Sequence, residues 1–326
     1  MAILAPLLDS CNRRIDYLRV SLTERCDLRC AYCQPRPRPE AAAGEDVLAA
    51  DDVVNIAAAA AQLGIRRIRL TGGEPLLRAD LEHIIRRLRV FPGIEDISLT
   101  TNGQSLAYRA AGLAAAGLDR VNISLDSLDP AGYTAITGGN LAAVLRGLDA
   151  ALAAGLRPVK ANVVLTSAAS LEQADLPAFL SLIRRRPVDV RFIKAMPTCG
   201  HLSYVPAQQV LARLSQMGEL LPVAGPEGGG PARYYQLDGS IGTIGIITPI
   251  SKPFCDHCNR LRVTARGDIV ACLFSPTGIS LLAALRGADP VGEVGALLLR
   301  AAARKPRCSS EVARPAGIAA MHVIGG

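Results

Sequence analysis

The stretch IDYLRVSLTERCDLRCAYC (Ile15–Cys33) joins a strand-like apolar run, Ile15–Leu22, to three closely spaced cysteines. A second strand-like run, Arg66–Leu70, leads into the glycine-rich turn TGGEP at residues 71–75. In α/β enzymes the carboxyl ends of parallel strands carry the active site. The two motifs therefore predict functional loops that lie side by side at one edge of a parallel sheet.

Strand-like and helix-like segments alternate from this stretch as far as residue 194. Further strands are expected at Ile94–Thr101, Arg120–Leu125, Pro158–Leu165 and Val188–Lys194, and helices at Asp51–Leu63, Asp80–Val90, Ser105–Gly117, Asn140–Gly155 and Leu171–Arg186. Such alternation is typical of right-handed βαβ units. Six units are fewer than the eight of a closed barrel, so an incomplete (βα)6 TIM-type barrel and an open doubly wound sheet both fit. No GxGxxG follows the first strand, which weighs against a dinucleotide-binding fold.

Beyond the sixth strand the character of the sequence changes. A linker-like segment, AGPEGGGP at Ala224–Pro231, is followed by a β-rich stretch at Tyr234–Ile250, by more cysteines and by a helical stretch at about 279–303. We therefore expect an α/β protein of two domains. The partial barrel would cover residues 1–223, and a smaller carboxyl-terminal domain with a second cluster would cover residues 224–326.

The composition of the 326-residue chain is that of a globular protein, with 50% hydrophobic and 20% charged residues. A formal net charge of +7 suits an anionic small substrate, but no long basic tract supports nucleic-acid binding. No apolar run reaches the 18 residues or so of a membrane-spanning helix, and the first residues do not form a secretory signal. We therefore expect a cytoplasmic protein with no membrane and no nucleic-acid partner.

Three cysteines, Cys26, Cys30 and Cys33, follow the first strand at CxxxCxxC spacing. The chain has nine cysteines, an odd number, and a reducing compartment disfavours disulfides, so metal binding or catalysis is the better interpretation. A [4Fe–4S] cube normally takes four thiolates, and three would leave one iron open to a ligand with amino and carboxylate groups. Buried structural cysteines, or a zinc site with a fourth ligand elsewhere, are the alternatives.

The turn after the second strand, TGGEP, is the second candidate element. Its glycines, Gly72 and Gly73, allow a close approach of another backbone. An exposed backbone edge and the carboxylate of Glu74 could together hold the ammonium group of a ligand. Alone this turn is an ordinary connection between a strand and a helix, but beside the three cysteines it predicts a binding site.

The carboxyl-terminal part holds a second group of three cysteines, Cys255, Cys258 and Cys272. Three thiolates again suggest a [4Fe–4S] cluster with one open iron, and a zinc site completed by His257 is the alternative. The run NRLR follows directly, and arginines two residues apart on an extended segment point to the same side. Arg260 and Arg262 would therefore suit a phosphate-bearing substrate, unless they form a solvated basic face.

Together, the first cysteine motif and TGGEP resemble the radical S-adenosylmethionine (SAM) superfamily. The resemblance implies that the open iron chelates the methionyl part of SAM and that an electron from the cluster cleaves SAM to a 5′-deoxyadenosyl radical. It also implies four SAM-binding positions, which are Tyr32, Gly73, Ser124 and Met196.

The second cysteine motif narrows this resemblance to the family of GTP 3′,8-cyclases, which begin molybdenum-cofactor biosynthesis. The segments that carry the resemblance span nearly the whole chain. They are YLRVSLTERCDLRCAYC (Tyr17–Cys33), RLTGGEPLLR (Arg69–Arg78), TTNG (Thr100–Gly103), VNISLDSLD (Val121–Asp129), GTIGIITPISKPFCDHCNRLRVTARGDIVACLFS (Gly242–Ser275) and the terminal Gly325-Gly326.

Membership of that family implies two [4Fe–4S] clusters, with the guanine of GTP bound at the second. The radical would take hydrogen from C3′ of the GTP ribose, and C3′ would then join C8 of guanine to give 3′,8-cyclo-7,8-dihydro-GTP. The terminal Gly325 and Gly326 match a family tail that reaches into the active site. The positions that match the GTP-binding residues are Arg19, Arg69, Thr100, Lys160, Arg191, Arg260 and Arg262.

The resemblance also implies partners. An electron donor of the flavodoxin or ferredoxin type would reduce the first cluster, and cyclic pyranopterin monophosphate synthase would take the product, while a homodimer stays open. Departures from the family pattern at Gln34, Pro197 and Cys308 bear on substrate handling and tail docking. Cys308, Cys11 and Cys199 match no cluster ligand, and we interpret them as incidental.

Two other functions compete with this one. A peptide-modifying radical SAM maturase fits less well, because such enzymes usually have a longer and more cysteine-rich carboxyl-terminal region. A non-catalytic iron–sulfur or zinc-binding module would leave TGGEP, Ser124 and the arginines without a purpose.

Overall fold

The computed structural model of the protein describes residues 6–33, 48–166, 175–195, 206–225, 230–248, 254–275 and 278–312. These residues form a twelve-stranded sheet in the order β12-β11-β10-β1-β2-β3-β4-β5-β6-β9-β8-β7. Its middle consists of six strands in chain order, each parallel to the next. They are β1 (Tyr17–Ser21), β2 (Arg67–Thr71), β3 (Asp96–Thr101), β4 (Arg120–Ser124), β5 (Val159–Leu165) and β6 (Val188–Lys194).

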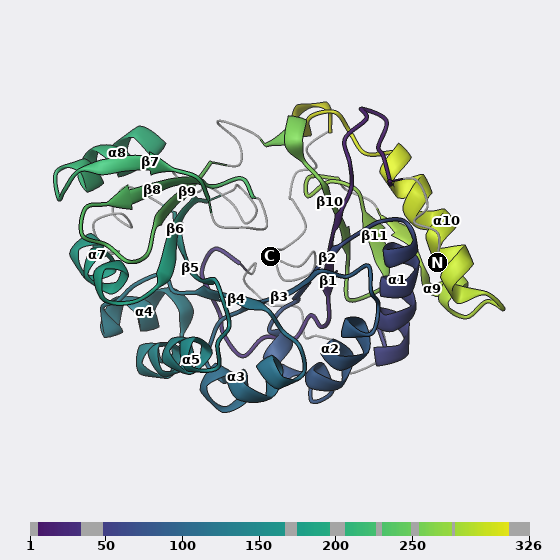
Figure 1. The fold of residues 1–326 in the computed structure, drawn as a ribbon, viewed down its shortest axis with the longest axis horizontal. Helices are drawn as coiled ribbons and strands as arrows, with labels where there is room; N and C mark the ends of the chain where they lie inside the picture. Colours follow the sequence, from purple (N-terminus) through teal and green to yellow (C-terminus); the bar gives the residue numbers. More distant parts are fainter. Residues whose placement is uncertain are drawn as a thin grey trace.

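Helices follow these strands as the sequence predicts. They are α1 (Ala50–Gln62), α2 (Leu81–Arg89), α3 (Leu106–Ala115), α5 (Leu141–Ala153) and α7 (Leu176–Arg185). Figure 1 shows α1, α2, α3 and α5 along the outer side of the curved sheet. These predicted strands and helices are confirmed to within a few residues where they are described, and the first four residues of the helix predicted at Leu171–Arg186 lie outside the described residues. The short helix α4 (Pro130–Thr137) was not predicted.

The order of the six central strands decides between the two architectures left open by the sequence. A doubly wound sheet reverses its strand order at a switch point. Strands β1 to β6 run without such a reversal. The doubly wound alternative is therefore wrong.

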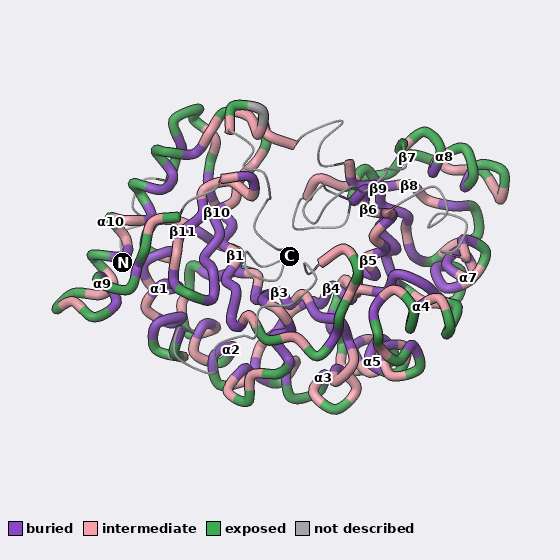
Figure 2. Tube along the Cα trace, turned by 180° about the vertical axis from the view of Figure 1, so that it is seen from behind, coloured by how far each residue is buried: buried purple, intermediate pink, exposed green. Residues whose placement is uncertain are grey.

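A period of two along the strands separates a helix-facing side from a polar side. On β1 the side chains of Leu18 and Val20 belong to the hydrophobic core, whereas Arg19 lies on the other side. On α2, buried Ile84 and Ile85 belong to the same core. Fully burying one such side chain contributes about 1.5–3 kcal/mol. Figure 2 shows the buried residues concentrated along the central strands and the adjoining helices.

The carboxyl-terminal part extends this sheet at both edges. After α8 (Ala207–Ser215), strands β7 (Leu220–Val223), β8 (Arg233–Leu237) and β9 (Ile244–Ile247) continue from β6, with β9 parallel to it. Strands β10 (Arg260–Val263), β11 (Asp268–Val270) and β12 (Ile279–Ser280) continue from β1, with β10 parallel to it. Strands from both sides of residue 224 therefore share one sheet, and the two-domain division stays a prediction.

Two α-helices, α9 (Leu282–Leu285) and α10 (Pro290–Ala303), and a 3-10 turn at Ser309–Glu311 lie in the last part of the described chain. Helix α10 packs against α1, the helix of the first βα unit. Among the residues described, no helix is both long and apolar enough to cross a membrane.

Candidate functional site

The loop that carries the first three cysteines lies against the TGGEP turn. The backbone N–H of Gly73 donates to the carbonyl of Thr23 at 2.6 Å, and that of Glu74 donates to the carbonyl of Arg25 at 2.7 Å. A Cβ atom built on Gly73 would lie 2.2 Å from the carbonyl oxygen of Arg25. Glycine is therefore required here because the cysteine loop occupies the space of a side chain. Cys26 is the next residue along this loop.

The carboxylate of Glu74 does not face a ligand, and the expectation that it could hold an ammonium group is wrong. Glu74 is buried, and its Oε1 accepts hydrogen bonds from the hydroxyl of Thr101 at 2.7 Å and the backbone N–H of Leu76 at 2.9 Å. Its Oε2 accepts from the backbone N–H of Asn102 at 2.7 Å. Burial raises the pKa of Glu74 to about 7 despite these bonds. The side chain instead joins the carboxyl ends of β2 and β3.

Side chains from the neighbouring strand ends hold the cysteine loop as well. Asn102, after β3, donates from Nδ2 to Oδ1 of Asp27 at 2.7 Å. The hydroxyl of Tyr32 donates to Oδ2 of Asp126 at 2.7 Å, and Oδ1 of Asp126 accepts from the backbone N–H of Val164 at 2.8 Å. Burial raises the pKa of Asp126 to about 6. The ends of β2, β3, β4 and β5 thus converge on the loop that follows β1.

The first cysteine group has the donor chemistry that an iron–sulfur cluster needs. Cys26, Cys30 and Cys33 are partly exposed, and the Sγ of Cys26 accepts a hydrogen bond from the backbone N–H of Leu28 at 3.4 Å. Burial raises the pKa of Cys26 to about 11, so a bound metal would have to draw off the proton. A cluster takes one thiolate per iron, and hydrogen bonds to its sulfurs tune its potential. These residues fit the group.

The second cysteine group lies at the opposite end of the strands. Cys258 comes two residues before Arg260, which starts β10 and pairs with Tyr17 at the start of β1. Cys26, in contrast, follows the end of β1. The five residues of β1 span about 13 Å, at roughly 3.3 Å per step. The two groups therefore lie beyond opposite ends of a strand of this length.

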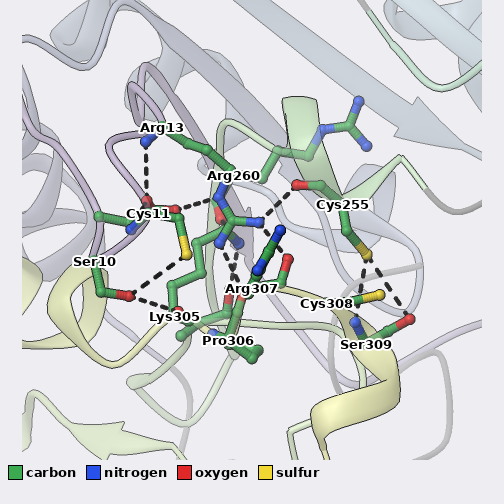
Figure 3. A network of polar contacts seen from close by, with 12 residues as sticks. Ser10, Cys11, Arg13, Cys255, Arg260, Lys305, Pro306, Arg307, Cys308 and Ser309 are labelled. Carbon is green, nitrogen blue, oxygen red and sulfur yellow. Dashed lines mark hydrogen bonds and ion pairs between the residues drawn. The ribbon is translucent and has the colours of Figure 1, made fainter.

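Lys305 ties this second group together (Figure 3). Lys305 is buried, and its Nζ donates to the carbonyls of Arg260 at 2.8 Å and Ala271 at 2.7 Å. These carbonyls lie close in sequence to Cys258 and Cys272. Burial raises the pKa of Cys258, but the positive charges of Lys305 and Arg260 outweigh it and lower the pKa overall. The thiolate is the form that binds iron, so Cys258 fits a second cluster, whereas burial raises the pKa of Cys255 and a bound metal would have to draw off its proton.

No three His, Cys, Asp or Glu side chains in the described ranges converge on a single metal ion. A cube makes no such demand, because each thiolate binds a different iron. His257, the fourth zinc ligand of the alternative interpretation, is exposed and lies beside the ring of Phe254 with 6.1 Å between ring centroids.

The polar side of the central strands carries the predicted GTP residues. In the register of the sheet, Arg262 on β10 lies opposite Arg19 on β1, and Arg19 lies opposite Arg69 on β2. Further along, Asn122 on β4 lies opposite both Thr100 and Lys160. Arg260 lies on the same face of β10 as Arg262, two residues later. The structure therefore places the seven predicted residues, including Arg191 on β6, on one face of the sheet.

Asparagines and glycine position Arg191 within this face. Its Nε donates to Oδ1 of Asn162 at 2.9 Å, and its Nη2 donates to Oδ1 of Asn122 at 2.9 Å. A Cβ atom on Gly245 of β9 would lie 2.9 Å from the Cγ of Arg191. The absence of a side chain at position 245 therefore makes room for the arginine. Neither asparagine was predicted, although both alternate with apolar residues on their strands.

Two aromatic rings complete the face. Tyr17 is buried, and its ring centroid lies 5.5 Å from the guanidinium carbon of Arg69 and 5.3 Å from that of Arg260. The Nζ of Lys160 lies 6.0 Å from the ring centroid of Tyr234. Cation–π contacts orient cations without neutralising them.

The cations on this face destabilise one another's charge. Burial, and then the charge of nearby Arg191, lowers the pKa of Lys160 to about 7. Burial, and then the charge of Arg260, lowers the pKa of Arg262 to about 10. A buried group of cations that weaken one another's charge suits an anion, whose negative charge would stabilise all of them.

The remaining predicted residues are divided between described and undescribed parts of the chain. Ser124 ends β4 and pairs with Asn162 of β5, at the same edge of the sheet as the first cysteine loop. Thr100 lies on β3. Met196, Gly325 and Gly326 fall outside the described residues, as do Gln34, Pro197 and Cys199. Cys308, which we interpreted as incidental, lies against Cys255, whereas Cys11 is exposed.

Comparisons with known proteins agree with this geometry. Residues 20–174 match the radical SAM superfamily, and residues 188–310 match the family described as Molybdenum Cofactor Synthesis C. The crystal structure of Streptococcus suis SuiB bound to S-adenosylmethionine covers 84% of this chain, with a TM-score of 0.57 at 16% identity, and 61% of SuiB is covered. The chain is thus a radical SAM protein by fold and by sequence.

More similar relatives identify the family within that superfamily. The chain is 45% identical over 305 residues to the GTP 3′,8-cyclase of Pelotomaculum thermopropionicum, covering 91% of this chain and 93% of the relative. It is 43% identical over 290 residues to that of Geobacter sulfurreducens, covering 87% and 88% respectively. The protein belongs to the GTP 3′,8-cyclase family.

Proposed function

We propose that this protein converts GTP to 3′,8-cyclo-7,8-dihydro-GTP, the first step of molybdenum-cofactor biosynthesis. The observation that carries the proposal is a single strand face with six cations between two groups of three cysteines. These cations are Arg19, Arg69, Lys160, Arg191, Arg260 and Arg262. A nucleoside triphosphate carries about four negative charges, which charge-assisted hydrogen bonds from such a face would neutralise.

The two cysteine groups would each hold a [4Fe–4S] cluster, with different tasks. Cys26, Cys30 and Cys33 would hold the cluster whose reduced form would let SAM supply the radical that takes hydrogen from C3′ of GTP. Tyr32, Gly73 and Ser124 surround the carboxyl ends of the strands there and would hold SAM together with Met196. The second group lies beyond the opposite end of the strands and would hold the guanine, so that the ribose lies between the two ends.

The fold supports this division. We infer an incomplete (βα)6 barrel whose inner side is the cation face, with the carboxyl-terminal strands supplying the second cluster. The division into residues 1–223 and 224–326 and the role of the terminal Gly325 and Gly326 in reaching the site belong to the same proposal. Thiolate ligands and radical chemistry favour a reducing, cytoplasmic setting. A flavodoxin- or ferredoxin-type donor and cyclic pyranopterin monophosphate synthase would be the partners, and a homodimer is compatible with the proposal.

The test measures the transfer of hydrogen from C3′ of GTP to 5′-deoxyadenosine. The anaerobically reconstituted protein would be incubated with SAM, dithionite and GTP deuterated at C3′, and the 5′-deoxyadenosine weighed by mass spectrometry. We expect deuterium in the 5′-deoxyadenosine. Unlabelled 5′-deoxyadenosine would mean that radical chemistry occurs with another hydrogen donor, and none at all from a protein with about eight irons would contradict the proposal.

A further inference from the structure

The segment from Lys305 to Ser309 is attached to the second cysteine group at more than one point (Figure 3). Besides the bonds of Lys305, the guanidinium of Arg13 donates to the carbonyls of Cys255 at 2.6 Å, Arg307 at 2.8 Å and Pro306 at 2.7 Å. The Nε of Arg13 in turn donates to Oδ2 of Asp9 at 2.6 Å. Arg13 therefore fixes this segment to the loop of Cys255.

At the end of this attachment, Cys308 lies directly against Cys255. Figure 3 shows the Sγ of Cys308 beside the Sγ of Cys255, and both cysteines are partly exposed. The backbone N–H of Ser309 also donates to the Sγ of Cys255 at 3.4 Å. The backbone N–H of Cys308 donates to Oε2 of Glu311 at 3.4 Å, so the position of the thiol is set by the backbone as well.

Contact between these two thiols has a consequence for an iron–sulfur cluster. Thiolates of one cube bind separate irons, so cysteines at two corners are kept apart by the cube itself. Two thiols in contact instead reach the same corner. Each iron of a cube takes one cysteine sulfur, so only one of the two would hold that iron at a time.

We propose that Cys308 is an additional iron ligand of the second cluster site, able to hold the iron that Cys255 otherwise binds. In the exchange, the Cys308 thiol gives its proton to water and its Sγ bonds to iron. The Sγ–iron bond of Cys255 breaks, and that thiolate takes up a proton. No oxidation state changes. The inference rests on the second cluster of the proposed function.

The experiment isolates the second site by removing the first. A C26A/C30A/C33A background would be reconstituted anaerobically with iron and sulfide, and its iron content and cluster spectrum measured. We expect about four irons in this background and about four after adding Cys255→Ala. Adding Cys255→Ala and Cys308→Ala together should reduce the iron to near zero. Cys258→Ala is the matched control and should also reach near zero, because the groups beside Cys258 are Lys305 and Arg260.

A second measurement uses the otherwise complete chain and requires no loss of cluster. Iodoacetamide should alkylate Cys308 in the loaded protein with all other cysteines present. It should fail to do so in the loaded Cys255→Ala variant, where Cys308 would be bound to iron. Far-ultraviolet circular dichroism would verify that each variant is folded.

Three results distinguish failure of this inference from failure of the function on which it rests. Loss of iron from Cys255→Ala in a folded background that itself holds about four irons would overturn the role of Cys308, as would continued alkylation of Cys308 in the loaded variant. A folded background that holds no iron would overturn the second cluster itself, and the inference with it.

Discussion

The two cysteine groups are built in different ways. The first is local, because its loop follows β1 and is held by the adjoining ends of β2, β3, β4 and β5. The second is assembled from distant parts of the chain. Arg13, near the amino terminus, and Lys305, near the carboxyl terminus, both donate to the carbonyls around its cysteines.

This difference indicates how the two groups should respond to change. A site supported by consecutive βα units shares its stability with the core of the sheet, so perturbations at the ends of the chain leave it intact. A site supported by long-range contacts depends on two segments that each lie more than 30 residues from the cysteine they support. Local openings of such segments cost less free energy than unfolding of the core.

The largest effects should come from the cysteines themselves. Cys30→Ala should abolish SAM cleavage while GTP affinity stays within about threefold of the parent protein, because the cation face is untouched. Cys258→Ala should leave SAM-dependent cluster spectra intact but weaken GTP binding. Exposed Cys11 provides the control, and Cys11→Ala should keep about eight irons. If Cys30→Ala lost GTP binding as well as SAM cleavage, the two ends of the strand face would not act separately.

Lys305→Met should damage only the second group. The substitution leaves two carbonyls without their donor, each at about 1–3 kcal/mol when buried. We expect lower thermal stability and a fall from about eight irons toward four, with the first cluster retained. Arg304→Met, at an exposed neighbouring position, should change neither. Retention of eight irons in Lys305→Met would contradict the long-range account.

Arg262→Ala should weaken GTP binding by about 10- to 150-fold, because a hydrogen bond to a charged group contributes about 1.5–3 kcal/mol. Arg262 lies on the face between the two groups. Isothermal titration under anaerobic conditions would measure the affinity. The control is Arg66→Ala, which removes a half-exposed ion pair with Glu95 just before the starts of β2 and β3. Comparable losses in the two variants would reject the face as the triphosphate site.

GTP affinity should depend on pH through Lys160. Burial, and then the charge of Arg191, lowers its pKa to about 7 in the free protein, and a bound triphosphate would favour the protonated form. Binding then takes up a proton above pH 7, so affinity should fall as pH rises, by up to about tenfold per unit. Lys160→Met cannot take up this proton. The difference between the parent protein and the variant in the pH dependence of GTP affinity therefore measures the contribution of Lys160. The same pH dependence of GTP affinity in both proteins would show that Lys160 does not contact the triphosphate.

Gly245→Ala should have the smallest effect. The added methyl group would meet the Cγ of Arg191 at 2.9 Å and displace the guanidinium, so we expect GTP affinity to fall by a few-fold. Gly295→Ala on α10 meets no atom within 4 Å and should stabilise the protein by about 0.5–1 kcal/mol. GTP titration would measure the loss of affinity in Gly245→Ala, and thermal unfolding would measure the gain of stability in Gly295→Ala.

The sequence predicted the first region more completely than the second. Alternation of apolar periods located β1 to β6, and the spacing of Arg260 and Arg262 placed them on one face. Helix α4 was missed, although Asp129 before Pro130 forms a typical amino-terminal cap signal. Local patterns also gave no sign that Glu74 is buried, because its partners come from the following strand.

Long-range pairing explains what could not be predicted of the second region. Nothing in the local pattern of β10 specifies β1 as its parallel neighbour, some 240 residues earlier. The support from Arg13 and Lys305 depends on that pairing. The contact of Cys308 with Cys255 depends on it too, which is why a cysteine without a family counterpart was interpreted as incidental.

The central claim is that GTP is held at the second end of the strand face and SAM at the first. Electron–nuclear double resonance with GTP labelled by ¹⁵N in its guanine tests it most directly. The reduced Cys30→Ala variant, which should retain only the second cluster, is expected to show ¹⁵N coupling, and Cys258→Ala, which should retain only the first, is expected to show none. Coupling in Cys258→Ala and its absence from Cys30→Ala would contradict the account.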